Sequence, residues 1–176
     1  ITRPGSDSRK PEIIDVEKVV AELGIPLARI SEPGTLDGGD VLKVNDTIYV
    51  GLGGRTNAEG IAQFAAIVEP LGAKVVTVPI TKVLHLKSAV TALPTGEIIG
   101  FEDFVDDQAI FPNFIAVPEE SGSHVVIVGD KRLLMAADAP ETAETLRDMG
   151  YFVIEVDISE FIKLEGCVTC LSVRIR

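Results

Sequence analysis

The residues best suited to chemistry in this 176-residue chain are its two cysteines, three positions apart in EGCVTCLSVRIR. Cys167 and Cys170 could form a redox pair or a disulfide, ligate a metal, or supply one nucleophile beside a bystander. A redox pair is expected to open a helix, whereas this β-branched ending predicts a strand. Structural zinc takes four ligands, and neither His85 nor His124 lies at zinc-finger spacing. Apart from an inert buried cysteine, the remaining interpretation is a nucleophile that needs a base.

Only two histidines could serve as that base. His85 alternates with Leu84 and Leu86, which predicts a strand position that faces away from both leucines. A satisfied, half-buried histidine is the plain alternative for this position. His124 follows a polar loop and is predicted to be a solvated residue at the start of a strand.

Charged residues at glycine-rich turns complete the candidate set. Asp37 and Asp40 flank the Gly-Gly pair of TLDGGD. Aspartate is common in plain turns because it bonds local N–H groups, but a carboxylate here could also orient His85. Arg3 and Arg55 are each followed by turn-like sequence. Most arginines are solvated surface charges, yet the guanidinium fork suits two-point capture of a carboxylate.

Three stretches of similar length and element order make up the middle of the chain. Each has the order strand, strand, helix, strand, with a period of about 40 residues, which is typical of arrays and propellers. Hairpin turns are predicted at Asn45-Asp46 and Gly129-Asp130. In chain order the predicted elements are a helix over 12–24, a hairpin over 39–53, a helix over 56–72 with Thr56 and Glu59 in a capping box, a strand over 74–80, a strand pair over 84–101, a weak helix near 103–109, a strand over 114–119, a hairpin over 124–136, a helix over 140–150 and a strand over 151–157.

These repeats predict an α/β fold, a ββαβ-repeat propeller, with residues 1–176 in a single domain. Residues 1–33 resemble the back half of a further repeat, and 166–176 resemble the opening strand of another. Each repeat needs neighbours to bury its faces. The sequence is therefore expected to hold roughly three and a half repeats of a ring that is incomplete at its N-terminal side.

The overall charge narrows the class of partner. The chain has 27 acidic against 16 basic residues, which argues against nucleic acid and anionic membranes because both bind clustered basic residues. A small cationic ligand suits the negative electrostatic field of such a surface. No stretch approaches the roughly 20 unbroken apolar residues of a membrane helix. Two cysteines cannot build a disulfide framework, so a cytoplasmic setting is predicted.

Four blocks of sequence occur in the order ITRPGSDSRKPE, TLDGGDVLKVNDTIYVGLGGRTNAEG, VLHLKSAV and GCVTCLSVRI. Together they resemble one family, dimethylarginine dimethylaminohydrolase, over essentially the whole chain. The resemblance implies the pentein fold, a propeller of five ββαβ units with the active site along its central axis. It also implies hydrolysis of Nω-methylated arginine to citrulline and a methylamine, with a small-molecule substrate and no cofactor.

Matching the blocks residue by residue implies a catalytic role for three candidates. Cys170, which follows the threonine of the T-C-x-S block, would be the nucleophile, and Cys167 receives no role. His85 would be the acid/base, and Asp37 the carboxylate that supports it. The thiolate would attack the guanidinium carbon, and His85 would protonate the departing amine and then activate water.

The same matching implies the contacts that hold the substrate. Arg3 and Arg55 would bind its α-carboxylate, and the backbone carbonyl of Leu164 would lie by its α-amino group. In the resembled family an acidic cluster for the guanidinium and a lid loop precede the TRPG block, whereas here nothing precedes Ile1. Roughly 80 residues are therefore expected to be missing.

A close relative and two other classes of function stay open. Arginine deiminases carry an H-x-D motif, and Lys87 in place of that aspartate favours the dimethylarginine enzyme. The same propeller fold also serves as a non-catalytic binding module, although the Cys–His–Asp set argues against that function here. An incomplete chain could also be an inactive fragment. The reaction needs no metal, although a thiol–imidazole pair could bind zinc adventitiously. The preferred substrate and the formation of a homodimer are left open.

Overall fold

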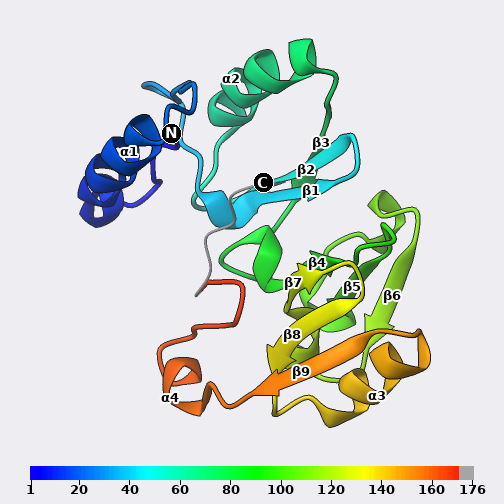
Figure 1. The fold of residues 1–176 in the computed structure, drawn as a ribbon. Helices are drawn as coiled ribbons and strands as arrows, with labels where there is room; N and C mark the ends of the chain where they lie inside the picture. Colours follow the sequence, from blue (N-terminus) through cyan, green and yellow to red (C-terminus); the bar gives the residue numbers. More distant parts are fainter. Residues whose placement is uncertain (171–176) are drawn as a thin grey trace. The chain divides into compact units, whose positions relative to one another are not determined.

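The computed structural model describes residues 1–170, which contain three sheets of three strands each (Figure 1). In every sheet the first strand pairs antiparallel with the second, and the second pairs parallel with the third. A parallel third strand needs a crossover connection. The predicted α/β fold of ββαβ repeats is thereby confirmed. The strands are β1 (Val41–Val44), β2 (Thr47–Leu52), β3 (Lys74–Pro79), β4 (Val90–Ala92), β5 (Ile98–Phe101), β6 (Phe114–Val117), β7 (Val125–Gly129), β8 (Arg132–Ala136) and β9 (Phe152–Val156).

The crossover in two of the repeats is an α-helix, and short 3-10 helices fill many of the connections. Over residues 1–170, no helix is long and apolar enough to cross a membrane. The α-helices are α1 (Ile13–Glu22), α2 (Ala58–Val68), α3 (Pro140–Asp148) and α4 (Ser159–Ile162), and the 3-10 helices are η1 (Asp7–Glu12), η2 (Gly38–Asp40), η3 (Glu69–Leu71), η4 (Leu86–Ser88), η5 (Glu102–Phe104), η6 (Gln108–Ile110) and η7 (Glu120–Ser123).

The chain divides into two compact units, a first unit over Ile1–Leu86 and a second unit that begins at Lys87. The first unit holds one ββαβ repeat with η1 and α1 before it, and the second holds two sheets with α3 and α4. That all 176 residues form one domain stays a prediction.

The core of the first unit lies between α2 and the sheet β1-β2-β3. Ile48 and Val50, two positions apart on β2, pack together with Ile61 of α2 and with Leu36. Residues two apart on a strand share one face, so the alternation in TIYVGL directs these side chains to the helix. The β1–β2 hairpin turns at Asn45-Asp46 as predicted, with Asn45 at a φ of 52°.

The N-terminus of α2 differs from its prediction in one contact. Asn57 is the cap, and its side-chain oxygen accepts the Gly60 N–H at 2.8 Å. The predicted capping box of Thr56 and Glu59 was wrong, because Thr56 is fully buried and its hydroxyl bonds two other residues. Asparagine is as good a cap as threonine, so the helix still begins where expected.

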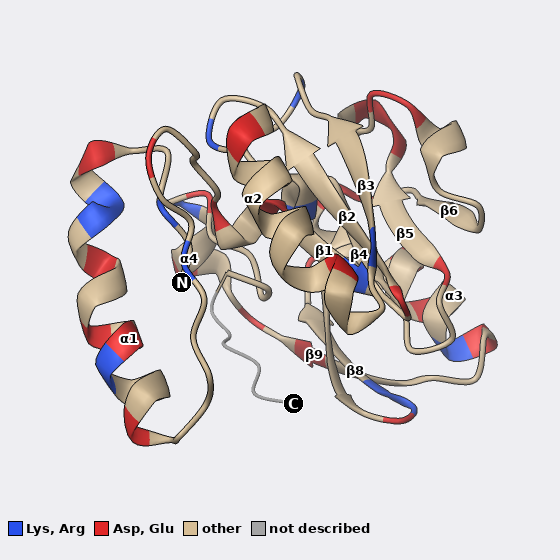
Figure 2. Cartoon of the chain, turned by 90° about the horizontal axis from the view of Figure 1, so that it is seen from above, with Lys and Arg blue, Asp and Glu red and all other residues tan. Residues whose placement is uncertain are grey.

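The helix predicted over 12–24 is confirmed as α1. None of its residues is buried, and both acidic and basic residues occur along it (Figure 2). Lys18 pairs with Asp15 one turn away at 2.9 Å. Helix formation here therefore rests on local contacts more than on burial.

The second unit packs both of its sheets and α3 around one core. Ile99 of β5, Met135 of β8 and Leu146 of α3 are each at most 1% exposed and belong to the same cluster. The hairpin predicted over 124–136 is confirmed as β7–β8, with Gly129 at a φ of 153°. That conformation favours glycine, which explains the residue at this turn.

The weak helix predicted near 103–109 was wrong. The segment forms η5 and η6 instead, with Val105 between them in an extended conformation at φ −94° and ψ 124°. Val105 is buried, and its β-branched side chain is well suited to extended backbone. Burial of this one side chain interrupts the helix that the surrounding residues would support.

Candidate active site

The Gly-Gly turn of the first unit places a buried carboxylate among three donors. Asp37 precedes η2, and its side chain is 2% exposed. Its Oδ1 accepts the Gly5 N–H at 2.9 Å. Its Oδ2 lies 2.9 Å from His85 Nε2 and accepts from the Arg9 guanidinium at 3.1 Å. Asp37 and His85, predicted from the sequence as a pair, are therefore in direct contact.

These donors determine the charge of Asp37. Burial alone would raise the pKa of this carboxyl, but the hydrogen bonds from His85 and Gly5 and the charges of His85 and Arg9 outweigh it. The pKa of Asp37 therefore lies below its ordinary value of 3.8. An ionised carboxylate can only accept, so the His85 proton in this contact belongs to Nε2. Nδ1 is then the ring nitrogen that can take up or release a proton.

His85 lies in a bend after β3 and not on a strand, so the prediction of a strand at this position was wrong. Leu86 is 1% exposed and Leu84 is 52% exposed, so the two leucines do not share a face. The cause is η4, which begins directly after His85 and delays the next strand. The pattern Leu-His-Leu is therefore no alternation of strand faces here.

The imidazole ring packs against a glycine of the turn. A Cβ atom at Gly39 would lie 2.7 Å from His85 Cγ, whereas a Cβ at Gly38 would meet nothing within 4 Å. The His85 side chain is 16% exposed. The absence of a side chain at Gly39 thus leaves room for the His85 ring, whereas Gly38 contributes nothing to that room.

A second buried carboxylate holds the backbone around the pair, and the sequence marks it only as a turn residue. Asp40 is fully buried; its Oδ2 accepts the Thr56 hydroxyl at 2.5 Å, and its Oδ1 accepts the Leu86 N–H at 2.9 Å. The Thr56 oxygen also accepts the Asp37 N–H at 3.1 Å. One network therefore bonds the backbone of Asp37 and that of the residue after His85.

Burial dominates the acidity of Asp40. It raises the pKa of this carboxyl above 3.8, while the hydrogen bonds from Thr56 and Leu86 oppose that shift. A Cβ atom at Gly51 would lie 2.9 Å from Asp40 Oδ1, so the glycine of β2 gives the carboxylate its place. No local pattern in the sequence connects these residues, because each contact joins segments far apart in the chain.

The two arginines predicted to bind substrate belong to neighbouring segments of the first unit. Arg3 donates to the Gly34 carbonyl at 3.2 Å and forms an ion pair with Glu32. Arg55 is half-buried, and its carbonyl oxygen would lie 2.3 Å from a Cβ at Gly5. The TRPG and GGRTN segments are thus in contact, but the roles of Arg3 and Arg55 in binding stay predictions.

The two cysteines of the second unit lie in a turn. The Cys170 N–H donates to the Cys167 carbonyl at 3.0 Å, so the strand predicted for this ending was wrong over these residues. The remainder of that predicted strand lies outside the described residues. The two Sγ atoms are 3.2 Å apart, with Cys170 exposed. Leu164, in a preceding turn, is 85% exposed. The catalytic role of Cys170 and the binding role of Leu164 stay predictions.

His124 directly precedes β7, as predicted for a residue at a strand start, but the prediction that it is solvated was wrong. His124 is 8% exposed, and its Nε2 lies 3.1 Å from the Ser88 carbonyl. Burial lowers the pKa of His124 below its ordinary value of 6.5. The ring is therefore held neutral, and its Nε2–H donates to that carbonyl.

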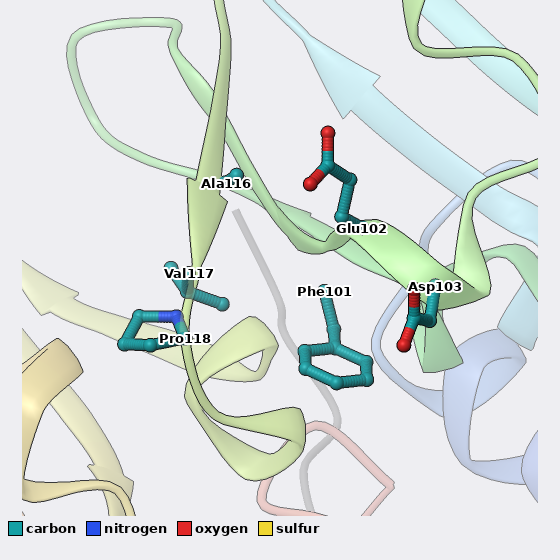
Figure 3. Close-up of a pocket in the computed structure, with 6 residues that line it drawn as sticks. All are labelled: Phe101, Glu102, Asp103, Ala116, Val117 and Pro118. Atoms are coloured by element: carbon teal, nitrogen blue, oxygen red, sulfur yellow. The ribbon is translucent and has the colours of Figure 1, made fainter.

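A shallow pocket of about 400 Å³ in the second unit contains none of the predicted catalytic residues. It lies where β5 and β6 end, with Phe101 and Val117 paired across the two strands (Figure 3). Its charged residues, Glu102 and Asp103, both belong to η5. Among the described residues, no group of three or more His, Cys, Asp or Glu side chains could hold a metal ion.

Comparison with known sequences decides the family. The sequence model of the arginine deiminase family matches residues 10–139. Over 176 residues the chain is 64% identical to the N(G),N(G)-dimethylarginine dimethylaminohydrolase of Streptomyces coelicolor, a match that covers all of this chain and 68% of that protein. The chain belongs to the dimethylarginine dimethylaminohydrolase family.

Solved structures of the dimethylarginine dimethylaminohydrolase family have the same fold. A cysteine-to-serine mutant from Pseudomonas aeruginosa, complexed with citrulline, matches with a TM-score of 0.91 and 39% identity over 99% of this chain and 70% of that chain. A histidine-to-glycine mutant, as an adduct with S-methyl-L-thiocitrulline, matches with a TM-score of 0.90 and 38% identity, with the same coverage. This chain spans about two thirds of the length of these family members.

Proposed function

We propose that this chain hydrolyses Nω,Nω-dimethyl-L-arginine and Nω-monomethyl-L-arginine to citrulline, with release of dimethylamine or methylamine. The observation that carries the proposal is the buried Asp37–His85 pair, with 2.9 Å between carboxylate and imidazole. It occurs in a chain 64% identical to a protein named for this reaction. The family member complexed with citrulline supports the product.

The first chemical step in the proposal is attack by Cys170, whose role follows from the family resemblance. A guanidinium carbon is a poor electrophile because its charge is delocalised, so water alone reacts slowly, whereas a thiolate is a strong nucleophile. A C–S bond forms and gives a tetrahedral adduct. His85 then donates its Nδ1 proton to the methylated nitrogen as the C–N bond breaks, and dimethylamine leaves as a neutral amine.

The second step consumes one water molecule. The thiouronium group left on Cys170 is attacked by water, and Nδ1 of His85 takes the proton that the water loses. Collapse of this adduct breaks the C–S bond and restores the thiolate; the remaining hydroxyl proton passes to solvent, and citrulline is released. Asp37 stays ionised throughout, and it fixes the ring orientation and stabilises the imidazolium form.

Arg3 and Arg55 hold the α-carboxylate of the substrate in this proposal. Arg3 forms its ion pair with Glu32, whose side chain is 79% exposed. A carboxylate on so exposed a side chain is easily displaced, because solvent screens the ion pair. The substrate carboxylate would replace it on the guanidinium fork. The backbone carbonyl of Leu164 would accept from the α-amino group.

Hydrolysis of unmodified arginine is the second candidate, favoured by the match to the arginine deiminase family. That reaction needs the same nucleophile and acid/base, and it would release ammonia. Lys87 stands two positions after His85, where deiminases have the aspartate of their H-x-D motif. This difference favours the methylated substrates.

The test is citrulline release from dimethylarginine and from arginine, measured in parallel for the wild type, Cys170→Ser and Cys167→Ser. We expect release from dimethylarginine, its loss in Cys170→Ser and its retention in Cys167→Ser. Release from arginine alone would replace the first candidate by the second. Absence of citrulline release from either substrate, or full activity of Cys170→Ser, would contradict both candidate functions.

The proposal includes a cytoplasmic setting and a homodimer. Thiols persist in a reducing compartment, which suits an enzyme with a cysteine nucleophile. Light scattering after size-exclusion chromatography measures the assembly directly, and a mass of one chain would contradict the dimer.

A further inference from the structure

The turn over the two cysteines has the geometry that a disulfide requires. It is closed by the hydrogen bond from Cys170 to Cys167, and the two sulfur atoms lie 3.2 Å apart. Such a turn keeps its first and fourth Cα atoms within about 7 Å. A disulfide spans Cα separations of about 4.4–6.8 Å. A strand would have placed these side chains on opposite faces. Because these residues form a turn, the argument against a redox pair no longer holds.

The side chain between the cysteines anchors the turn in the second unit. Val168 is 3% exposed and packs with Val126 and Ile158. Cys170 is exposed, whereas Cys167 is half-buried. A small solute can therefore reach the Cys170 sulfur first, and the Cys167 sulfur is already within contact distance of it.

The surroundings of Cys167 favour its protonated form. The hydrogen bond to Cys170 and then burial raise the pKa of Cys167 above that of an ordinary thiol. Cys167 is thus the thiol that keeps its proton while Cys170 reacts. An exposed cysteine next to a second cysteine that can resolve its oxidised form is the arrangement found in redox-sensitive cysteines.

We propose that Cys167 and Cys170 are a modification site for hydroperoxides and form a reversible disulfide. The Cys170 thiolate attacks a peroxide oxygen, the O–O bond breaks, and a sulfenic acid and hydroxide or alkoxide result. The Cys167 sulfur then attacks the Cys170 sulfur, and its proton leaves with the displaced hydroxyl group as water. The two sulfurs together lose two electrons, which reduce the peroxide, and a dithiol reverses the change by exchange.

The consequence for catalysis rests on the proposed function. If Cys170 is the nucleophile, the disulfide removes the thiolate that attacks the substrate, and activity falls at least about tenfold. The disulfide would also protect Cys170 from the irreversible sulfinic and sulfonic acids. Formation of the bond itself depends only on the turn, and so it can be tested without any assay of turnover.

The experiment is peroxide titration of the reduced, folded chain, followed by mass spectrometry. Both cysteines fall in one tryptic peptide, residues 164–174, because cleavage follows Lys163 and Arg174. We expect this peptide to lose two hydrogens in the wild type and to regain them after treatment with dithiothreitol. Oxidation of Met135 or Met149 would instead add oxygen to other peptides.

Variants separate the two sulfurs. In Cys167→Ser, which keeps its basal activity, we expect Cys170 to form a sulfenic acid that dimedone traps, and peroxide inactivation that dithiothreitol reverses less completely than in the wild type. In Cys170→Ser we expect Cys167 to react far more slowly. A wild type that gains oxygen on Cys170 without loss of hydrogens, or that forms disulfides only between chains, would overturn the proposal. Formation of the disulfide in a protein that releases no citrulline would uphold this site and contradict the proposed function.

Discussion

Thr56 donates its hydroxyl proton to the buried carboxylate of Asp40 at 2.5 Å, and the same oxygen accepts the Asp37 N–H. Asp40 also accepts the N–H of Leu86, the residue after His85. One hydroxyl and one carboxylate therefore fix the backbone on both sides of the Asp37–His85 contact. The orientation of that pair therefore depends on side chains outside the pair itself.

Replacing Thr56 by valine is expected to destabilise the first unit and to lower kcat. The substitution leaves the Asp40 carboxylate buried without the Thr56 donor, which costs about 1–3 kcal/mol of unfolding free energy. Thr56→Ser keeps the hydroxyl and is the matched control. Urea unfolding and citrulline release measure the two effects, and equal behaviour of the two variants would show that the hydroxyl does not matter.

The glycine pair offers a sharper comparison. Gly39→Ala would place a Cβ 2.7 Å from the His85 ring and must displace it, whereas Gly38→Ala meets open space. We expect kcat to fall at least about tenfold in Gly39→Ala, because small misplacement of a catalytic group is costly. Gly38→Ala should retain activity. Steady-state kinetics of both variants provide the check, and the idea fails if the two alanines behave alike.

The acidity of Asp37 predicts how its contribution to stability varies with pH. Its folded pKa lies below 3.8, so the ionised form stabilises the fold. This contribution is fully present above 3.8 and is lost as the pH falls through the folded value. The difference in unfolding free energy between wild type and Asp37→Asn should therefore be constant near neutral pH and shrink below about pH 4. Denaturant titrations across this range test it, and a difference that persists at low pH would contradict the sign.

His124 predicts acid sensitivity at a higher pH. Its folded pKa lies below 6.5, so the unfolded chain takes up the proton first as the pH falls. The stability contributed by neutral His124 is present above the unfolded value and is lost below it. His124→Gln keeps a donor for the Ser88 carbonyl but has no such proton. On lowering the pH from about 7.5 to 5.5, the wild type should lose more unfolding free energy than this variant, and parallel losses would sink the prediction.

The repeat order, the two hairpins and the position of α2 could be predicted because their signals are local. The Asn45-Asp46 turn needs one residue in left-handed backbone, and apolar residues at a spacing of two or three to four distinguish strand from helix. The residues of the Gly-Gly turn suggested a carboxylate that could orient His85, but the choice of Asp37 came from the family resemblance. The two residues are 48 positions apart in the chain.

The differences arise where a distant partner outweighs a local preference. The Leu86 N–H bonds Asp40 and so is not available to a strand, although its neighbours are typical of one. Thr56 turns inward to the same carboxylate, and Asn57 caps the helix in its place. The turn at Cys167 is held by burial of the valine that follows it. In each case a tertiary contact decided between two conformations that the sequence allows.

Every ladder between the named strands of residues 1–170 joins strands of the same repeat. Backbone amides of the strands are consequently sheltered repeat by repeat. Opening of a repeat breaks its own ladder and leaves the others paired. Amide hydrogen exchange would then divide the protein into three blocks of protection, and the block around β1, β2 and β3 would report how often the carboxylate that supports His85 meets water.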